Sequence, residues 1–194
     1  MALADYLDLR TAALEQAGRP DLADRFATLT KLAEVHLSRA MRSRDQITEA
    51  SVTVTSGVAP LPSDFIEAIG LYNTSGYEYV QQPPQATRTS GTTTFYSVTG
   101  GNITGQLPDG SLTLQYYAAV PTITGSMTAT NWLLTKHPGV YLYAVLYEIE
   151  KWTRNAEAAQ AMKALRDAEI MDARAQDQGE MYSRARVRLQ GVTP

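Results

Sequence analysis

The side chains that could carry out acid–base or metal chemistry are few in this chain and lie far apart along it. Its two histidines, His36 and His137, are about a hundred residues apart, so they do not have the spacing of one metal site. Cysteine is absent, which excludes disulfides and thiolate metal sites. Asp64 and Glu67 have a spacing that suits a general acid–base pair, but they flank an expected turn, where solvated carboxylates are common. We therefore expect no catalytic, metal-binding or cofactor-binding residues, and no enzyme.

The charge distribution argues against a dedicated nucleic-acid binder and divides the chain into regions. The net charge of the 194 residues is −3. Between residues 45 and 135 there are six acidic side chains and one base, Arg88, and this region is also rich in Thr, Ser, Gly and Tyr. The two ends are rich in Ala, Leu and Arg instead. Such a shift in composition is typical of a β region inserted between helical regions.

Hydrophobic periodicity agrees with this division and predicts an α+β fold. The N- and C-terminal helices are expected to form one helical bundle, with a small antiparallel β-sheet or barrel inserted between them. The expected segments are N-terminal helices over 1–47, a β-rich insertion domain over 48–130 with a polar loop over 81–94, C-terminal helices over 131–181, and a C-terminal segment over 182–194.

The terminal helices are predicted from apolar residues that recur every three or four positions. The first is expected over 2–17, and the second is capped by Asp21 and contains His36 as a surface or interface imidazole. The last is expected from about 155 to 178. Its thin apolar stripe consists of Ala158, Ala161, Leu165, Ala168 and either Met171 or Asp172.

The insertion is predicted from alternation of apolar and polar residues, the pattern of a half-buried strand. This pattern begins near Thr48, ends at Pro121 and predicts about six short strands. The segment VAPLPSDF is expected to be a connection broken by its prolines.

The stretch from Asn131 to Trp152, NWLLTKHPGVYLYAVLYEIEKW, is the most apolar in the chain. Its most apolar run, 140–149, is too short to span a bilayer, which needs about twenty apolar residues, and it already contains Glu148. The sequence shows no convergent polar groups that would indicate a ligand pocket. A helix that is apolar all round, capped by Thr135 or His137, is expected to be covered on every side, partly by neighbouring subunits. The residues expected in this packing are Trp132, Tyr141, Tyr143, Tyr147 and Trp152.

The C-terminal segment has a different pattern, in which arginines alternate with apolar residues. If it is extended, its arginines lie on one side, and it could add to the sheet edge of a partner or lie along a partner's surface. As a helix it would continue the preceding one, and as a chain terminus it could be disordered in the isolated subunit. The residues concerned are Arg184, Arg186, Val187, Arg188 and Leu189.

Five phrases of the sequence resemble, in their order, those of tailed-phage head–tail adaptor (head-to-tail connector) proteins. They are AEVHLSRAMRSRD, VTSGVAPLPSDFIEAIGLY, FYSVTGGNI, YYAAVPTIT and NWLLTKHPGVYLYAVLYEI, and they cover most of the chain between 33 and 152. Each phrase alone is weak, whereas their order and spacing together are specific. The sequence departs from the family's pattern at Gly139, where an acid commonly follows His-Pro.

The resemblance implies a structural virion protein that acts by assembly. Such adaptors form a ring, usually twelve-fold, below the portal protein, and they link the capsid vertex to the tail while leaving a channel for double-stranded DNA. The implied partners are the portal protein and a downstream tail or nozzle protein. The C-terminal segment matches no phrase of the family, and its expected contact with the portal protein rests on its own pattern of arginines and apolar residues. Gln82 and Arg88 in the polar loop would contact the tail or a neighbouring subunit. The implied location is the head–tail junction of a virion assembled in the bacterial host cytoplasm, with no membrane involved.

Other functions stay open at this point. Within the virion, the chain could be another tail-ring component, such as a terminator or stopper. Of a different class is a carbohydrate- or peptide-binding module that uses the Thr- and Tyr-rich sheet. A metal-independent hydrolase using Asp64 or Glu67 is a further alternative.

Overall fold

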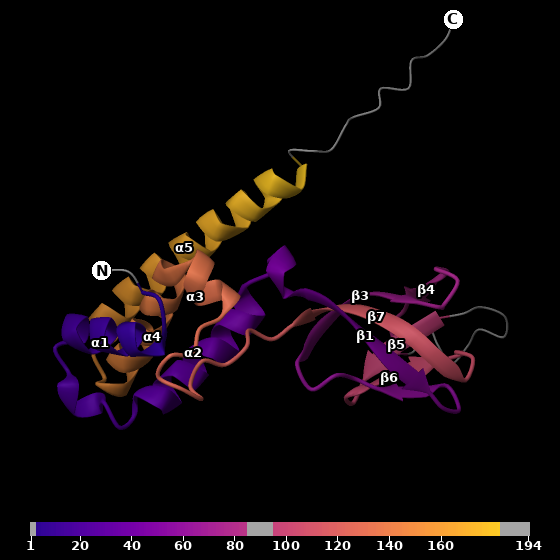
Figure 1. Cartoon of the computed structure of the whole chain (residues 1–194), viewed down its shortest axis with the longest axis horizontal. Helices are drawn as coiled ribbons and strands as arrows, with labels where there is room; N and C mark the ends of the chain where they lie inside the picture. The colour runs from indigo at the N-terminus through magenta and orange to yellow at the C-terminus, as the bar shows by residue number, and fades with distance from the viewer. Residues whose placement is uncertain (1–2, 85–94, 183–194) are drawn as a thin grey trace, which may run out of the picture. The chain divides into compact units, whose positions relative to one another are not determined.

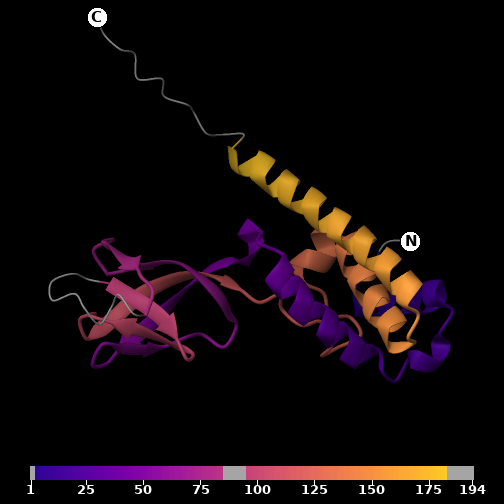
Figure 2. The same ribbon diagram turned by 180° about the vertical axis from the view of Figure 1, so that it is seen from behind.

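The computed structural model describes residues 3–84 and 95–182 of the chain. The chain forms two compact units, Met1–Arg44 together with Pro121–Pro194, and Asp45–Val120. The first unit is helical and the second is a β-sheet, as Figures 1 and 2 show from opposite sides. The predicted α+β fold, with terminal helices in one bundle and an inserted sheet, is therefore confirmed.

The helical unit is built around one central helix, α4. Its described elements are α1 (Tyr6–Ala17), the 3-10 turn η1 (Pro20–Leu22), α2 (Phe26–Ala40), α3 (Trp132–Lys136), α4 (Pro138–Trp152) and α5 (Ala156–Tyr182). Helices α1, α2, α3 and α5 all pack against α4, so both ends of the chain share one core (Figures 1 and 2).

The contacts of two aspartates, Asp5 and Asp21, explain where the first two helices begin. The Asp5 carboxylate accepts a hydrogen bond from the Asp8 amide at 3.0 Å, so α1 begins at Tyr6 and not at residue 2. Helix α2 begins at Phe26, later than the predicted cap at Asp21. The reason is that η1 intervenes and the Asp21 carboxylate instead pairs with Arg19, at 2.7 Å.

Two helices, α3 and α4, replace the single helix predicted after the sheet. Neither Thr135 nor His137 caps with its side chain. The Asn131 side chain accepts from the Leu134 amide at 2.9 Å, which begins α3 one residue later. Pro138 then occupies the first turn of α4, where its missing N–H costs no helical hydrogen bond.

The segment between the sheet and α3 belongs to the helical unit. The sheet unit ends at Val120, whereas the insertion was expected to extend to residue 130. The amides of Tyr6 and Leu7 donate to the carbonyls of Ala129 and Met127, both at 2.9 Å. These bonds fasten the segment to the start of α1, which periodicity along the chain does not reveal.

The second unit is a seven-stranded sheet in the order β1-β7-β3-β4-β5-β6-β2. The 3-10 turn η2 (Arg44–Gln46) crosses the boundary between the two units. The strands are β1 (Ile47–Val54), β2 (Val58–Pro60), β3 (Phe65–Tyr72), β4 (Glu78–Gln81), β5 (Phe95–Thr99), β6 (Asn102–Gly105) and β7 (Gly110–Ala118). The additional strand, compared with the six expected, is β2, which tolerates Pro60 because it lies at the end of the strand order.

The pairing of β4 with β5 is parallel, which corrects the prediction of a wholly antiparallel sheet. Residues 82–94 separate the two strands, and that connection is longer than the two to five residues of a typical hairpin. The other paired strands among the described residues are antiparallel.

The sheet nearly closes into a barrel through the turn between β1 and β2, the first and last strands of the order. The Thr55 and Val58 backbones exchange hydrogen bonds of 2.9 and 3.1 Å across this turn. Gly57 has a φ of +76°, and a Cβ on it would lie 2.6 Å from the Gly105 carbonyl oxygen. Closure therefore depends on a residue without a side chain at position 57.

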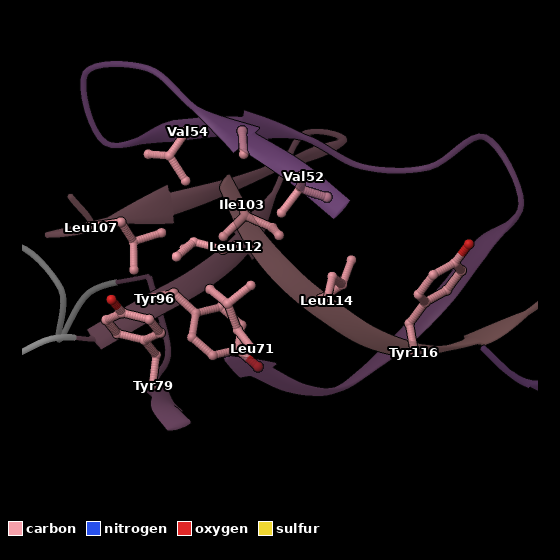
Figure 3. Packing of buried hydrophobic residues seen from close by; sticks show 11 residues of the cluster. Val52, Val54, Leu71, Tyr79, Tyr96, Ile103, Leu107, Leu112, Leu114 and Tyr116 are labelled. Atoms are coloured by element: carbon pink, nitrogen blue, oxygen red, sulfur yellow. The ribbon is translucent and has the colours of Figure 1, made fainter. Parts of the chain in front are cut away.

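The inward positions of the strands form the core of the sheet unit. Figure 3 shows the side chains of Val52 and Val54 from β1 on the same inner face as those of Leu112 and Leu114 from the neighbouring β7, with Tyr96 from β5 packed beside Leu71. Every second residue of β1 and β7 contributes, which is the period that predicted them.

Candidate functional site

The centre of the helical unit holds a buried polar contact that joins three distant parts of the chain. One carboxylate oxygen of Glu34, on α2, accepts from the Tyr141 hydroxyl at 2.6 Å and from the Ile123 amide at 2.9 Å. Burial, and secondly the charge of Glu34, raises the pKa of Tyr141 well above its ordinary value. The hydroxyl therefore stays protonated and donates. This contact positions α2, α4 and the segment before α3.

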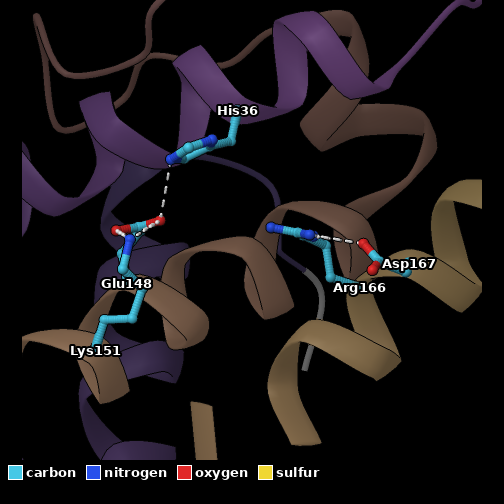
Figure 4. A network of polar contacts seen from close by, with 5 residues as sticks. All are labelled: His36, Glu148, Lys151, Arg166 and Asp167. Atoms are coloured by element: carbon cyan, nitrogen blue, oxygen red, sulfur yellow. Dashed lines mark hydrogen bonds and ion pairs between the residues drawn. The ribbon is translucent and has the colours of Figure 1, made fainter. Parts of the chain in front are cut away.

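A second buried carboxylate, Glu148 on α4, lies beneath two half-exposed cationic or imidazole side chains, one of them on α2 (Figure 4). Its oxygens lie 3.1 Å from the Lys151 ammonium and 3.6 Å from His36 Nε2. The His36 side chain is about half exposed, as expected of a surface imidazole. Neither Glu34 nor Glu148 was singled out from the sequence, because the pattern predicts buried apolar residues and does not reveal a carboxylate whose partners come from other elements.

The aromatic residues predicted to take part in packing occupy three different environments. Tyr141 is fully buried inside the unit, so it packs the subunit's own core and has no surface to offer a neighbour. Trp132, Tyr143 and Tyr147 are partly buried. Trp152 is exposed.

Cationic side chains lie over two aromatic rings of α4. The Arg25 guanidinium lies 5.6 Å from the Trp152 ring centroid. Tyr147 has the Lys151 ammonium at 5.0 Å and the Arg166 guanidinium at 5.1 Å from its ring centroid. Arg166 also pairs with Asp167, as Figure 4 shows. The outer edge of α4 is therefore amphipathic, which suits a surface that meets another protein.

The apolar stripe predicted on α5 is not the face that packs on the bundle. The buried positions of α5 include Ala159, Ile170 and Ala173. By contrast, Leu165 and Met171 of the predicted stripe are exposed. At 3.6 residues per turn, the predicted stripe and the buried positions point in nearly opposite directions. The predicted stripe therefore lies on the outer side of the helix.

The carboxylates considered for catalysis have structural surroundings. The Tyr116 hydroxyl donates to Asp64 at 2.9 Å, and the Asp64 carbonyl accepts from the Ala119 amide at 2.7 Å. Glu67 is exposed on β3. Across residues 3–84 and 95–182, no three His, Asp or Glu side chains are grouped as a metal site would require. Within the same ranges, no helix is long and apolar enough to cross a membrane.

The residues expected to contact partners outside the bundle are only partly described. Gln82 is half-buried, and its backbone N–H donates to the Tyr96 carbonyl at 2.8 Å, which extends the β4–β5 pairing. Its contact with a neighbour stays a prediction. Arg88 lies outside the described residues. So do the C-terminal residues Arg184, Arg186, Val187, Arg188 and Leu189.

A family model described as SU10 adaptor protein matches residues 4–189, nearly the whole chain. The chain belongs to the SU10 adaptor protein family. This confirms the resemblance to phage adaptor proteins and identifies a structural protein with an adaptor role in a phage virion. No curated protein matches the chain significantly.

Gly139, in the first turn of α4, lies close to a carboxylate of α5. A Cβ at this position would lie 3.0 Å from a carboxylate oxygen of Glu169 on α5. An acidic side chain here would meet that carboxylate, and two like charges in contact destabilise a helix pair.

Proposed function

We propose that the protein forms a ring below the portal protein and links the capsid vertex to the tail, with a channel for double-stranded DNA. Membership of the SU10 adaptor protein family carries this proposal. The ring, its roughly twelve copies and the channel go beyond the family assignment. A terminator or stopper ring, or a carbohydrate- or peptide-binding module, is the competing function.

The two-unit architecture supports an assembly role. A ring subunit needs two different surfaces that bind its neighbours, and further surfaces for the components above and below. The helical unit has apolar residues on its outer side, including Leu165 and Met171 on α5 and Trp152 on α4. The sheet unit is a separate compact body, which suits a contact with the downstream tail or nozzle protein.

The charge of the sheet unit favours a role in which DNA passes by this unit and is not bound by it. Residues 45–120 contain six acids and a single base, Arg88. Phosphates bind where Lys and Arg release counterions, so a surface poor in these residues does not hold the duplex. We propose that DNA passes this subunit without sequence-specific contact.

The proposed contact with the portal protein is made by the C-terminal segment. Arg184, Arg186 and Arg188 alternate with apolar residues in the sequence, a pattern that suits an added strand with one basic side. A terminal segment can reach a neighbouring protein without movement of the folded units.

The test combines the full chain with the portal protein of the same virion and examines the complex by negative-stain microscopy and light scattering. We expect a ring stacked on the portal. A variant that lacks 182–194 should keep its circular-dichroism spectrum and lose docking. A second variant with Gln at the three arginines isolates their charge. If the chain stays monomeric in the presence of the portal protein, the proposed ring is wrong. If the shortened chain docks as the full chain does, the proposed role of the C-terminal segment is wrong. Glycan binding by the monomer would favour the competing module.

A further inference from the structure

Helix α2 has a second apolar row on the side opposite the one that packs in the bundle. Its buried row includes Phe26, Leu29 and Leu37. Leu32 and Val35 are 45% and 48% exposed, and at 100° per residue they point away from that row. Thr28 and Arg39 extend the outer row by one turn in each direction, which gives the spacing i, i+4, i+7, i+11 of a packing stripe.

Helix α5 has the same arrangement. Leu165 and Met171 are 43% and 69% exposed, opposite the buried Ala159, Ile170 and Ala173. The rest of this outer row is made of the exposed alanines Ala161, Ala164, Ala168 and Ala175. Alanines leave shallow grooves between larger side chains, so another helix could approach α5 closely there.

The charges next to the two outer rows are opposite in sign. The exposed charged side chains of α2 are those of Lys31 and Arg39, both cations. Three acids, Glu157, Glu169 and Asp172, and one base, Lys163, are exposed on the described part of α5. Two faces of like charge would repel each other, whereas these two faces attract and favour one pairing over α2–α2 or α5–α5.

We propose that the outer face of α2 in one copy packs against the outer face of α5 in the next copy of this chain. The contact joins two different surfaces and is therefore the heterologous kind from which a ring is built. Leu32 and Val35 would fill the spaces between Leu165, Ala168 and Met171, with Arg39 near Asp172. This inference rests on the proposed ring and names the faces that form it.

The absence of cysteine from the natural sequence makes a cross-linking test selective. In the full chain bound to the portal protein, the double variants Leu32→Cys/Leu165→Cys and Val35→Cys/Ala168→Cys sample two registers of the contact. After treatment with a flexible bismaleimide, we expect denaturing gels to show a ladder that extends past the dimer. The controls are the four single variants and Glu15→Cys/Leu165→Cys, where Glu15 is exposed on α1.

Microscopy of the same samples separates the two levels of the proposal. Rings on the portal without a ladder above the controls overturn the α2–α5 contact and leave the proposed function standing. The absence of rings with the unmodified chain overturns both. A charge exchange gives an independent measurement: Arg39→Glu should weaken assembly at least tenfold, and Asp172→Lys in the same chain should restore part of it. Assembly that is insensitive to both changes also overturns the contact.

Discussion

Replacement of Glu34 tests whether the buried carboxylate holds the helical unit together. In Glu34→Ala, the Tyr141 hydroxyl and the Ile123 amide both lose their acceptor, and Tyr141 and Ile123 are fully buried. Each lost bond to a charged group costs about 1.5–3 kcal/mol. The expected loss in the free energy of unfolding is therefore about 3–5 kcal/mol, because removal of the buried charge offsets part of the sum.

The milder variant Glu34→Gln gives a graded result. One oxygen of Glu34 accepts both bonds, so a glutamine oxygen in the same place keeps both acceptors and loses only their charge assistance. We expect it to cost about 1–2 kcal/mol. Thermal unfolding followed by circular dichroism measures both variants, at roughly 4 °C for each kcal/mol in a unit of this size.

Two further measurements make the result specific to this contact. The Ile123 amide should exchange its hydrogen with solvent faster in Glu34→Ala, since its acceptor is the Glu34 side chain. A double-mutant cycle of Glu34→Gln with Tyr141→Phe should give a coupling energy of about 1 kcal/mol or more. The matched control is Glu15→Ala, at an exposed position of α1. If Glu34→Ala unfolds at the temperature of this control, the buried carboxylate does not stabilise the bundle and the reasoning is wrong.

Two predictions concern the sheet unit. Burial raises the pKa of Tyr96 and Tyr116 from 10.0 to about 12, with the Glu78 charge and the Asp64 hydrogen bond as the next causes. The folded state thus holds the two tyrosine protons more tightly than the unfolded state does. The stability that the two protonated hydroxyls contribute is therefore complete below pH 10 and is lost as pH rises towards 12. Tyr116→Phe should reduce that loss of stability in alkaline unfolding experiments. Gly57→Ala should destabilise the sheet by about 2 kcal/mol or more in denaturant unfolding. The control Gly76→Ala, also at positive φ but with nothing within 4 Å of its added Cβ, should cost only about 1 kcal/mol. Equal losses of stability in the two variants would contradict the clash with Gly105.

The order of the elements was predictable from the sequence, since it depends on local pattern. A period of 3.6 at the chain ends and a period of 2 in the middle separate helices from strands without knowledge of tertiary contacts. The family likeness has the same character, because phrases in a fixed order are a property of the chain alone. The absence of cysteine and the wide separation of the histidines are also read directly from the sequence.

The tertiary structure decided which surfaces are covered and how distant segments meet. The sequence showed an apolar stripe on α5 but not its direction, and the structure buries a different face around Ile170. A helix displays side chains on all sides, and only its neighbours determine which side is covered. The parallel pairing of β4 with β5 likewise depends on contacts beyond each strand.

The same distinction explains the buried carboxylates. A glutamate in a helical pattern is expected to face solvent, because burial without partners is costly. Glu34 is buried because the Ile123 amide and the Tyr141 hydroxyl, from segments about 90 and 107 residues further along the chain, meet it in the fold. The sequence alone thus determined which helices and strands this adaptor has and in which order. Only the fold brought together the groups that stabilise a buried carboxylate, and only the fold left the outer rows of α2 and α5 uncovered.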